Sequence, residues 1–384
     1  MKTRDTSPHT QHLGQAPMYF DYAASTPVDG RVLQAMLPYF TQEFGNASNV
    51  LHNYGKNARR AVIRSLELIA SSIGATAPDQ IIVTPSATSA NWLAMVSAGT
   101  AGSKPGHIIT SPVEHSSVIA AARHLEKIGG AVTWLEVNSN GLVNTDQLKK
   151  EIRQDTALVS IGHVNNETGV CQDIESISHL CMDRGVTLHT DATQSFGKTG
   201  FRVDNALVSM ATFSAHKIYG PIGIGCLYVR NNTATKISVP GDYSATANVP
   251  SLVGFATAAE LTASMSTSEI SRIKYISMEF LRDLHSRVDV QLNGSSTNRT
   301  WDILNLSIRN IDGADLARAA KIAISTGSAC RTGSREPSPT LHAMGLDIDR
   351  CRSAVRVSFG RFTTATDAGA AVDEIQKVVS LLRD

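Results

Sequence analysis

The chain contains the run Phe213-Ser214-Ala215-His216-Lys217-Ile218-Tyr219-Gly220-Pro221, which decides the fold that we expect. An apolar, strand-like segment at 206–213 leads into this run, and a glycine-rich turn follows through Gly223 and Gly225. A lysine between a histidine and a tight turn suits a Schiff base to an aldehyde cofactor, whose phosphate Ser214 and His216 could hold. The alternative is a solvated surface lysine, because most lysines are exposed charges.

The composition indicates a soluble enzyme with two domains. The chain has 384 residues and exceeds the usual size of a single hydrophobic core. Its formal net charge is +1, so nothing points to direct binding of nucleic acid or to a membrane partner. No apolar run approaches the roughly 18 residues of a membrane helix. Residues 1–17 are polar and lack the apolar core of a secretory signal.

The cysteines favour a reducing, cytoplasmic location. They are an odd set without a C-x-x-C pair, which argues against a disulfide framework and against a zinc site. Cys226 stands between Gly225 and Leu227, as expected for a buried structural cysteine. The full set is Cys171, Cys181, Cys226, Cys330 and Cys351.

Strand-like and helix-like runs alternate over the first two thirds of the chain. This rhythm predicts βα units on a mostly parallel sheet, with the loops at the carboxyl ends of the strands building the site. We expect strands at 80–84, 107–113, 131–137, 156–162, 186–190 and 206–213, and helices at 57–73, 90–97, 116–128 and 145–152.

The pattern changes from about residue 253 and predicts a smaller α+β domain. A long helical stretch reaches about residue 287. We expect strands after it at 288–292, 302–308 and 354–359, and helices at 314–322 and 367–382.

Polar residues at two expected strand ends extend the candidate site. Asp191 ends a strand and is followed closely by Gln194, and its carboxylate could pair with a protonated cofactor ring nitrogen. A helix N-cap is an equally good interpretation of Asp191. Ala87 and Thr88 lie between a strand and a helix, where N–H groups and a hydroxyl can cradle a phosphate, although simple helix capping is the more frequent use of such a position.

Three more polar residues follow expected strands or lie on one. His115 follows a strand and could stack on a cofactor ring or move protons. Asn166, in the segment His163-Val164-Asn165-Asn166-Glu167, also follows a strand. Arg356 lies on the last expected strand, where its planar fork could clamp a substrate carboxylate. Apart from Arg356, the candidate residues are a lysine, an aspartate, a glutamine, a histidine, an asparagine and a threonine that all fall at the carboxyl ends of strands of one sheet, so they predict one shared site.

Cys330 is a second chemical centre. It stands in the run Ile324-Ser325-Thr326-Gly327-Ser328-Ala329-Cys330-Arg331-Thr332-Gly333-Ser334, which is too rich in glycine and serine for a core element. We expect a mobile loop with an exposed thiol. Arg331 and Arg335 flank the thiol, and nearby cations favour the thiolate that acts as a nucleophile.

Taken together, these motifs make the chain similar to a cysteine desulfurase of the NifS/IscS type. That type belongs to the class V aminotransferase group of fold-type I enzymes that use pyridoxal 5'-phosphate. The resemblance covers nearly all of the chain from Tyr19 onward. It rests on Tyr19-Phe20-Asp21-Tyr22-Ala23-Ala24, Phe44-Gly45-Asn46 with His52, the His-Val-Asn-Asn-Glu segment, Asp191-Ala192-Thr193-Gln194, Ser214-x-His216-Lys217, Gly327-Ser328-Ala329-Cys330, Glu336-Pro337-Ser338 and Arg356-x-Ser358-Phe359-Gly360-Arg361.

The resemblance implies a role for each candidate residue. Lys217 would hold pyridoxal 5'-phosphate as a Schiff base, Asp191 would pair with its ring nitrogen, and His115 would stack on its ring. Gln194 and Asn166 would lie near the phenolic oxygen or the substrate carboxylate. Ala87, Thr88, Ser214 and His216 would bind the phosphate, joined by Thr246 from the other subunit of a homodimer. Arg356 would bind the carboxylate of L-cysteine, and Cys330 would attack its sulfur and pass it to a sulfur-acceptor protein.

The resemblance also implies the domain organisation. Residues 26–258 would form the large, cofactor-binding domain with the mostly parallel sheet. Residues 1–25 and 259–384 would form the small α+β domain, which carries the cysteine loop.

The segment at 240–250 departs from the pattern of this family. Tyr243 stands where an arginine is expected and Ala247 where a glutamate is expected. This suggests a specialised paralogue, for example one dedicated to DNA phosphorothioation rather than to iron–sulfur assembly. Two other functions stay open: a related lyase or transaminase of the same fold, such as a selenocysteine lyase, and a non-catalytic paralogue.

Overall fold

The computed structural model describes residues 18–231, 246–327 and 337–383, apart from the side chain of Ser266. Cys330, Arg331 and Arg335 lie outside the described residues, as does Tyr243. The expectation of a mobile loop with an exposed thiol therefore stays a prediction.

A seven-stranded sheet forms the centre of the large domain. Its strands lie in the order β2-β8-β7-β6-β5-β3-β4. β8 runs antiparallel to both of its neighbours, and the other neighbouring pairs are parallel. The expected α/β fold is confirmed. The strands are β2 (Ile81–Thr84), β3 (His107–Thr110), β4 (Ala131–Trp134), β5 (Thr156–Ser160), β6 (Thr187–Asp191), β7 (Met210–Ser214) and β8 (Gly225–Val229).

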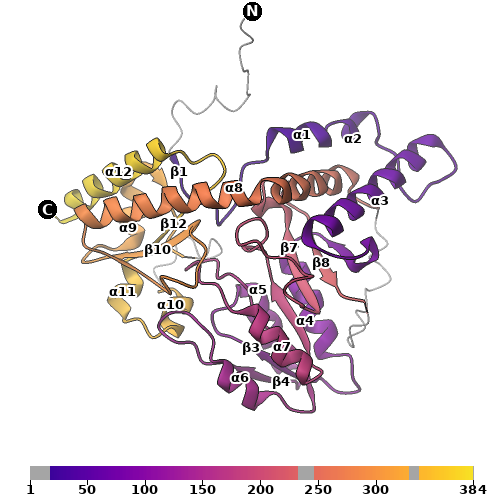
Figure 1. Ribbon diagram of the computed structural model, residues 1–384, viewed down its shortest axis with the longest axis horizontal. Coiled ribbons are helices and arrows are strands. Elements are labelled where there is room, and N and C mark those ends of the chain that lie inside the picture. The colour runs from indigo at the N-terminus through magenta and orange to yellow at the C-terminus, as the bar shows by residue number, and fades with distance from the viewer. Residues whose placement is uncertain (1–17, 232–245, 328–336, 384) are drawn as a thin grey trace, which may run out of the picture.

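Helices cover both faces of this sheet, as its apolar composition requires (Figure 1). Successive strand residues point to opposite faces, so Ile108 packs in a core with α4 and α5, whereas Ile109 packs in the core that contains α3, α6 and α7. The helices are α1 (Gly30–Met36), α2 (Pro38–Thr41), α3 (Asn53–Ile73), α4 (Ala87–Gly99), α5 (Ser116–Lys127), α6 (Thr145–Glu151) and α7 (Ile174–Asp183).

A three-stranded antiparallel sheet, in the order β12-β10-β9, forms the small domain. Its own apolar core includes Phe20, Leu304, Val357 and Phe359. The elements are β9 (Val290–Leu292), β10 (Ile303–Ile308), β12 (Ala354–Ser358), α9 (Gly313–Ala319), α10 (Pro339–Ala343), α11 (Ile348–Arg352) and α12 (Ala365–Arg383).

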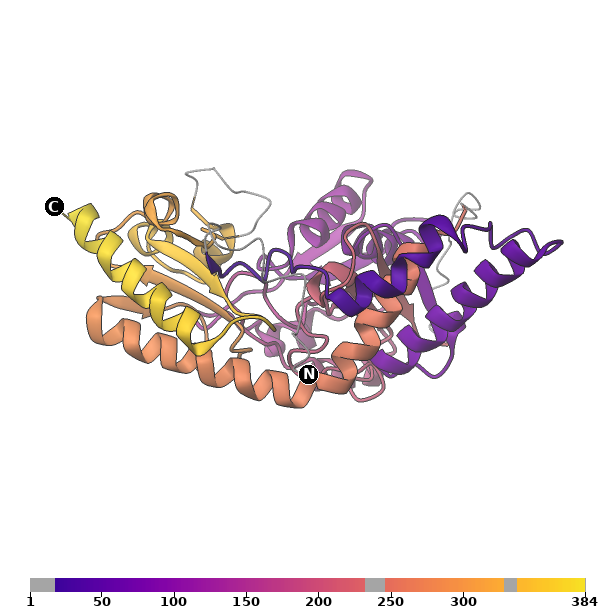
Figure 2. The same cartoon turned by 90° about the horizontal axis from the view of Figure 1, so that it is seen from above.

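Helix α8 (Val249–Arg287) joins the two domains. Phe255 in its first half belongs to the core of the large domain, and Phe280 in its second half belongs to the core of the small domain. Figure 2 shows α8 running along one side of both domains, with α12 beside its second half. One continuous helix therefore packs against the cores of both domains.

The structure corrects several expected boundaries. The strand expected at 206–213 begins only at Met210, because Leu207 has a φ of 51°, which interrupts an extended strand. The helix expected at 314–322 ends at Ala319, and β11 (Ile322–Ala323) instead pairs with β1 (Met18–Tyr19). Strand β8 and helix α7 were not expected. Within the described residues, no helix combines the length and apolar character needed to span a membrane.

Candidate active site

A cavity of about 350 Å³ lies where the sequence predicts the site. It is bounded by the carboxyl ends of β6 and β7, the start of α4 and strand β12. Of the predicted site residues, Thr246 does not line the cavity and Cys330 lies outside the described residues. Those that line it are Ala87, Thr88, His115, Asn166, Asp191, Gln194, Ser214, His216, Lys217 and Arg356.

Lys217 ends the short 3-10 turn η3 (Ala215–Lys217), which follows β7 directly. Its Nζ donates hydrogen bonds to the carbonyl oxygens of Ala23 and Ala24, each at 2.6 Å. Burial lowers the pKa of Lys217 to about 7, and the charges of Lys198 and Arg356 act in the same direction. A large share of this amine is therefore neutral near pH 7, which is the form that attacks an aldehyde. The solvated-surface interpretation is wrong.

Asp191 is the last residue of β6, and a turn rather than a helix follows it at 193–198. One carboxylate oxygen accepts a hydrogen bond from Asn91 Nδ2 at 2.7 Å, and the other accepts one from the Thr193 N–H at 3.0 Å. The N-cap interpretation is therefore wrong. The carboxylate is held in place at the cavity wall, where it can pair with a cationic group.

His115 caps helix α5 and also lines the cavity. Its Nδ1 accepts a hydrogen bond from the Ser117 N–H at 3.2 Å, so in the neutral ring the proton is on Nε2. Burial lowers the pKa of His115, an effect that the nearby Asp191 opposes and Lys217 reinforces. The ring is thus neutral at pH 7 and able to stack on an aromatic group or to donate a proton from Nε2.

Glu114 is a residue of the cavity wall that the sequence interpretation missed. Its two carboxyl oxygens accept hydrogen bonds from Ser111 Oγ at 2.7 Å and from the Gly162 N–H at 2.8 Å. Burial, with a contribution from Asp191, raises the pKa of Glu114 to about 7. The available signal was its place directly before His115 and directly after the strand expected at 107–113.

The start of α4 forms the opposite wall. Ser86 caps this helix by accepting a hydrogen bond from the Ser89 N–H at 3.1 Å, so the capping interpretation holds for Ser86. Ala87 and Thr88, the first two helical residues, still face the cavity and can offer N–H groups to an anion. A Cβ on Gly225 would lie 2.6 Å from the Phe213 carbonyl oxygen and 3.0 Å from the Ala87 nitrogen, so only glycine lets β8 pass this helix start.

Ser214 and His216 flank Lys217 and complete this wall. Burial lowers the pKa of His216 to about 4, and the charges of Lys217 and Lys198 add to the effect. His216 Nδ1 lies 3.3 Å from Ser25 Oγ. The ring is therefore neutral, and it can serve an anion as a hydrogen-bond donor rather than as a cation.

Arg356 brings the small domain to the cavity. Its side chain is 1% exposed, and it pairs with the Asp21 carboxylate at 2.7 Å. It also donates to the Asn166 carbonyl oxygen at 2.9 Å. Its Nε is buried without a hydrogen-bond partner. A buried guanidinium N–H that lacks a partner at a cavity wall fits an anionic substrate group.

Glu167 ties the described ends of the cysteine segment to the site. Ser338 Oγ donates a hydrogen bond to Glu167 Oε2 at 2.5 Å, and Thr340 Oγ1 donates to Oε1 at 3.3 Å. A Cβ on Gly327 would lie 3.4 Å from Glu167 Oε2. The described residues on both sides of the segment that carries Cys330 therefore lie close to Glu167, which follows the cavity residue Asn166.

Comparison with known proteins agrees with this geometry. The sequence profile described as Aminotransferase class-V matches residues 18–370. The chain belongs to the class-V aminotransferase family. It is 39% identical over 379 residues to the cysteine desulfurase IscS of Rickettsia felis, a match that covers 96% of this chain and 92% of that one. The activity that follows is that of a cysteine desulfurase, an enzyme that depends on pyridoxal 5'-phosphate.

Solved structures of similar proteins share the fold of the desulfurase. A NifS-like protein superposes with a TM-score of 0.88 at 28% identity, covering 95% of this chain and 100% of that chain. A structure of SspA in complex with cysteine superposes with a TM-score of 0.79 at 33% identity, covering 90% of this chain and 100% of that chain.

The residues around the cavity fit pyridoxal 5'-phosphate. The cofactor has an aldehyde, a basic ring nitrogen, a phenolic oxygen and a phosphate. The cavity offers an amine with a lowered pKa, a fixed carboxylate and an amide, which are Lys217, Asp191 and Gln194. It also offers the N–H groups at the start of α4 for the phosphate.

Proposed function

We propose that the desulfurase converts L-cysteine to L-alanine in this cavity and leaves the sulfur as a persulfide on Cys330. The observation that carries the proposal is the convergence of Lys217, Asp191 and Arg356 on one cavity, beside the ends of the Cys330 segment. Within this proposal the site residues keep the roles that the family resemblance implies. The large domain spans 26–258, and 1–25 with 259–384 form the small domain.

Each cavity residue would have a separate role in binding the cofactor and substrate or in moving a proton. When bound, pyridoxal 5'-phosphate supplies an electron sink next to the substrate α-carbon. Asp191 holds a proton on the ring nitrogen, and the start of α4 binds the phosphate. Arg356 binds the substrate carboxylate through its fork. The Lys217 amine, with a pKa near 7, would take the α-proton, and His115 Nε2, which also lines the cavity, would donate or accept a proton at the substrate.

The sulfur step is a displacement at sulfur. The Cys330 thiolate attacks the substrate sulfur, a sulfur–sulfur bond forms, and the carbon–sulfur bond breaks. The carbon keeps the electron pair and takes a proton, which yields alanine and a persulfide on Cys330. Arg331 and Arg335, next to Cys330 in the sequence, favour the thiolate.

The test is incubation of the purified desulfurase with L-cysteine alone. We expect alanine and protein-bound sulfur in equal amounts in the first turnover, with no keto acid required. A requirement for a keto acid would support a transaminase, and the absence of any product from a protein that carries the cofactor would support a non-catalytic paralogue. Either outcome overturns the proposal.

Arg356→Lys should raise KM for L-cysteine by about 10- to 100-fold, because lysine keeps the charge but loses the planar fork that binds a carboxylate. Steady-state kinetics measure the effect. Arg361→Lys is the matched control. The Arg361 side chain is also only 7% exposed, and it also forms an ion pair, with Asp29 at 2.9 Å. Equal KM values for the two variants would exclude Arg356 as the carboxylate clamp.

We also propose that the working unit is a homodimer in which Thr246 reaches the partner's site. Thr246 is exposed and does not line the cavity of its own chain. Large apolar side chains are exposed on the α2–α3 side, among them Phe44 and Leu51, which is 89% exposed. Such a patch is typical of an interface.

The dimer should persist at micromolar concentration in analytical ultracentrifugation. Leu51→Asp should weaken it together with the turnover of cysteine, because a charge would be buried in the interface. A monomer that turns over L-cysteine at the full rate would contradict the shared site.

The sulfur acceptor is proposed to be a protein of iron–sulfur assembly or of a specialised pathway such as DNA phosphorothioation. The altered segment at 240–250 supports a specialised role. The cysteines of the described residues are all free thiols, which supports a cytoplasmic location. Transfer of labelled sulfur from the loaded desulfurase to purified acceptors of each class would decide between the pathways.

A further inference from the structure

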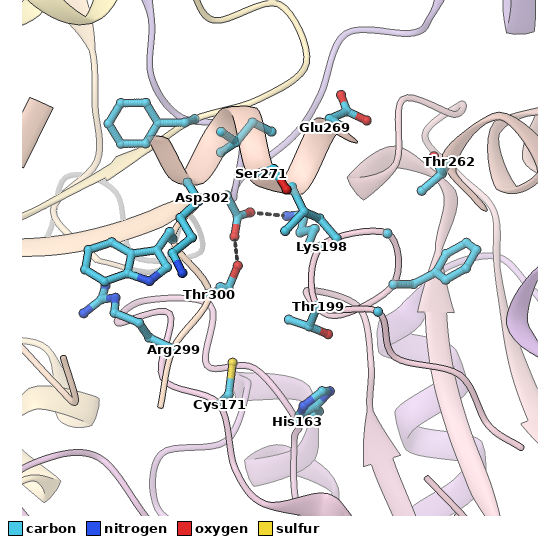
Figure 3. A pocket seen from close by; sticks show the side chains of 18 of the residues that line it. His163, Cys171, Lys198, Thr199, Thr262, Glu269, Ser271, Arg299, Thr300 and Asp302 are labelled. Atoms are coloured by element: carbon cyan, nitrogen blue, oxygen red, sulfur yellow. Dashed lines mark hydrogen bonds and ion pairs between the residues drawn. The ribbon is translucent and has the colours of Figure 1, made fainter. Parts of the chain in front are cut away.

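A second cavity, of about 720 Å³, lies between the large and small domains and shares Lys217 with the active-site cavity. Its walls are the loop at 196–200, the middle of α8 and the segment at 297–302. A buried ion pair crosses from one domain to the other here, between Lys198 Nζ and Asp302 Oδ2 at 3.0 Å, with side chains only 15% and 7% exposed (Figure 3). Thr300 Oγ1 donates a hydrogen bond to the other oxygen of Asp302.

Lys198 makes a second contact, with a residue of the active site. Its Nζ donates a hydrogen bond to Gln194 Oε1 at 2.8 Å. On the other side of the same amide, Gln194 Nε2 donates to the Ala23 carbonyl oxygen at 2.8 Å. These two contacts fix the orientation of the Gln194 amide. In the flipped orientation the amide nitrogen, a donor, would face the Lys198 ammonium, and the amide oxygen would face the Ala23 carbonyl oxygen. The amide nitrogen carries two hydrogens, so one remains after the bond to Ala23.

We propose that Lys198, anchored by Asp302, is a positioning residue that keeps the Gln194 amide turned so that its nitrogen donates to the phenolic oxygen of the bound cofactor. The inference rests on the proposed placement of pyridoxal 5'-phosphate in the smaller cavity. The phenolic oxygen is anionic when the cofactor is linked to an amine. A donor stabilises that charge, whereas the oxygen of a flipped amide would repel it.

The loop that carries Lys198 is fixed in place. Gly197 has a φ of 74°, and a Cβ at this position would lie 2.0 Å from Thr262 Cγ2 on α8. The Lys198 N–H donates to the Ser195 carbonyl oxygen at 3.0 Å. Asp302 stands immediately before β10 of the small domain. The chain Asp302–Lys198–Gln194 therefore connects the small domain to the cofactor side of the large domain.

The experiment is a pH titration of the absorbance of the cofactor-loaded desulfurase. The titration midpoint reports the pKa of the Schiff base between the cofactor and Lys217. A hydrogen-bond donor to the phenolic oxygen and a nearby cation both lower this pKa. Lys198→Met should therefore move the titration midpoint upward by about one pH unit. Lys198→Arg should retain most of the wild-type midpoint. Lys274→Met, an exposed residue of the same cavity, is the matched control and should leave the midpoint unchanged.

A double-mutant cycle separates positioning from the charge of Lys198 acting at a distance. If Lys198 acts through Gln194, adding Lys198→Met to Gln194→Leu should produce less than half of the shift seen in the wild-type background. Fully additive shifts would overturn the proposal.

Asp302→Asn gives an independent test that keeps Lys198. Loss of a negative charge alone would lower the midpoint, whereas loss of the anchor that positions Lys198 should raise it. A lowered or unchanged midpoint would overturn the role of Asp302. A wild-type protein that binds no cofactor through Lys217 would instead refute the proposed function, so the two failures are distinguishable.

Discussion

Replacing Lys217 with alanine should lower turnover of L-cysteine by about 10³-fold or more, because the same amine is expected to hold the cofactor and to take the α-proton. The variant should also lose the covalent link that borohydride reduction traps, while some pyridoxal 5'-phosphate stays bound through Asp191 and the start of α4. Mass spectrometry of the reduced protein measures the link. Lys127→Ala, an exposed lysine at the end of α5, is the control. A reducible link that persists in Lys217→Ala would identify another lysine.

Because the pKa of Lys217 is lowered, the reaction of this amine with the cofactor should depend on pH near neutrality. Only the neutral amine attacks an aldehyde, and its fraction rises as the pH rises through the pKa. Because burial lowers this pKa from 10.5 to about 7, the rate at which the cofactor-free protein takes up the cofactor should rise through pH 7. It should be level by about pH 8.5, since there the amine is almost fully neutral. A rate that still rises tenfold per pH unit at pH 9 would show that the amine is not perturbed.

The sequence alone located most of the candidate site, for a physical reason. The carboxyl ends of parallel strands meet at one edge of a sheet, so polar residues that end or follow strands converge even when they are far apart in the chain. Asp191 ends β6, Lys217 follows β7, and His115 follows β3. Each could be placed once its strand was recognised, and each lines the cavity.

The contacts that tune these residues could not be predicted in this way. Arg356 and Asp21 pair across 335 positions, and Lys198 meets Asp302 only because the two domains pack together. No local pattern encodes either pair. Strand β8 was missed since its glycine start resembles a turn, yet glycine is required there by the close approach of α4.

Cys330→Ser should abolish the formation of protein-bound sulfur and reduce alanine release by about 10³-fold or more, because a serine hydroxyl is a far poorer nucleophile towards sulfur than a thiolate. The variant should keep the cofactor absorbance and should still show a spectral change when L-cysteine is added, since the cofactor cavity does not depend on Cys330. Labelled sulfur on the protein and alanine in solution are the two measurements.

Cys171→Ser is the matched control for this prediction. Burial raises the pKa of Cys171 to about 12, so its thiol is protonated at neutral pH and cannot replace Cys330 as the nucleophile. This variant should therefore form the persulfide at the wild-type rate. Ser338 and Thr340, which follow the Cys330 segment in the chain, donate hydrogen bonds to Glu167, the neighbour of the cavity residue Asn166. Wild-type amounts of alanine and protein-bound sulfur in Cys330→Ser would show that the sulfur leaves by another route, and the enzyme would then be a lyase without a persulfide.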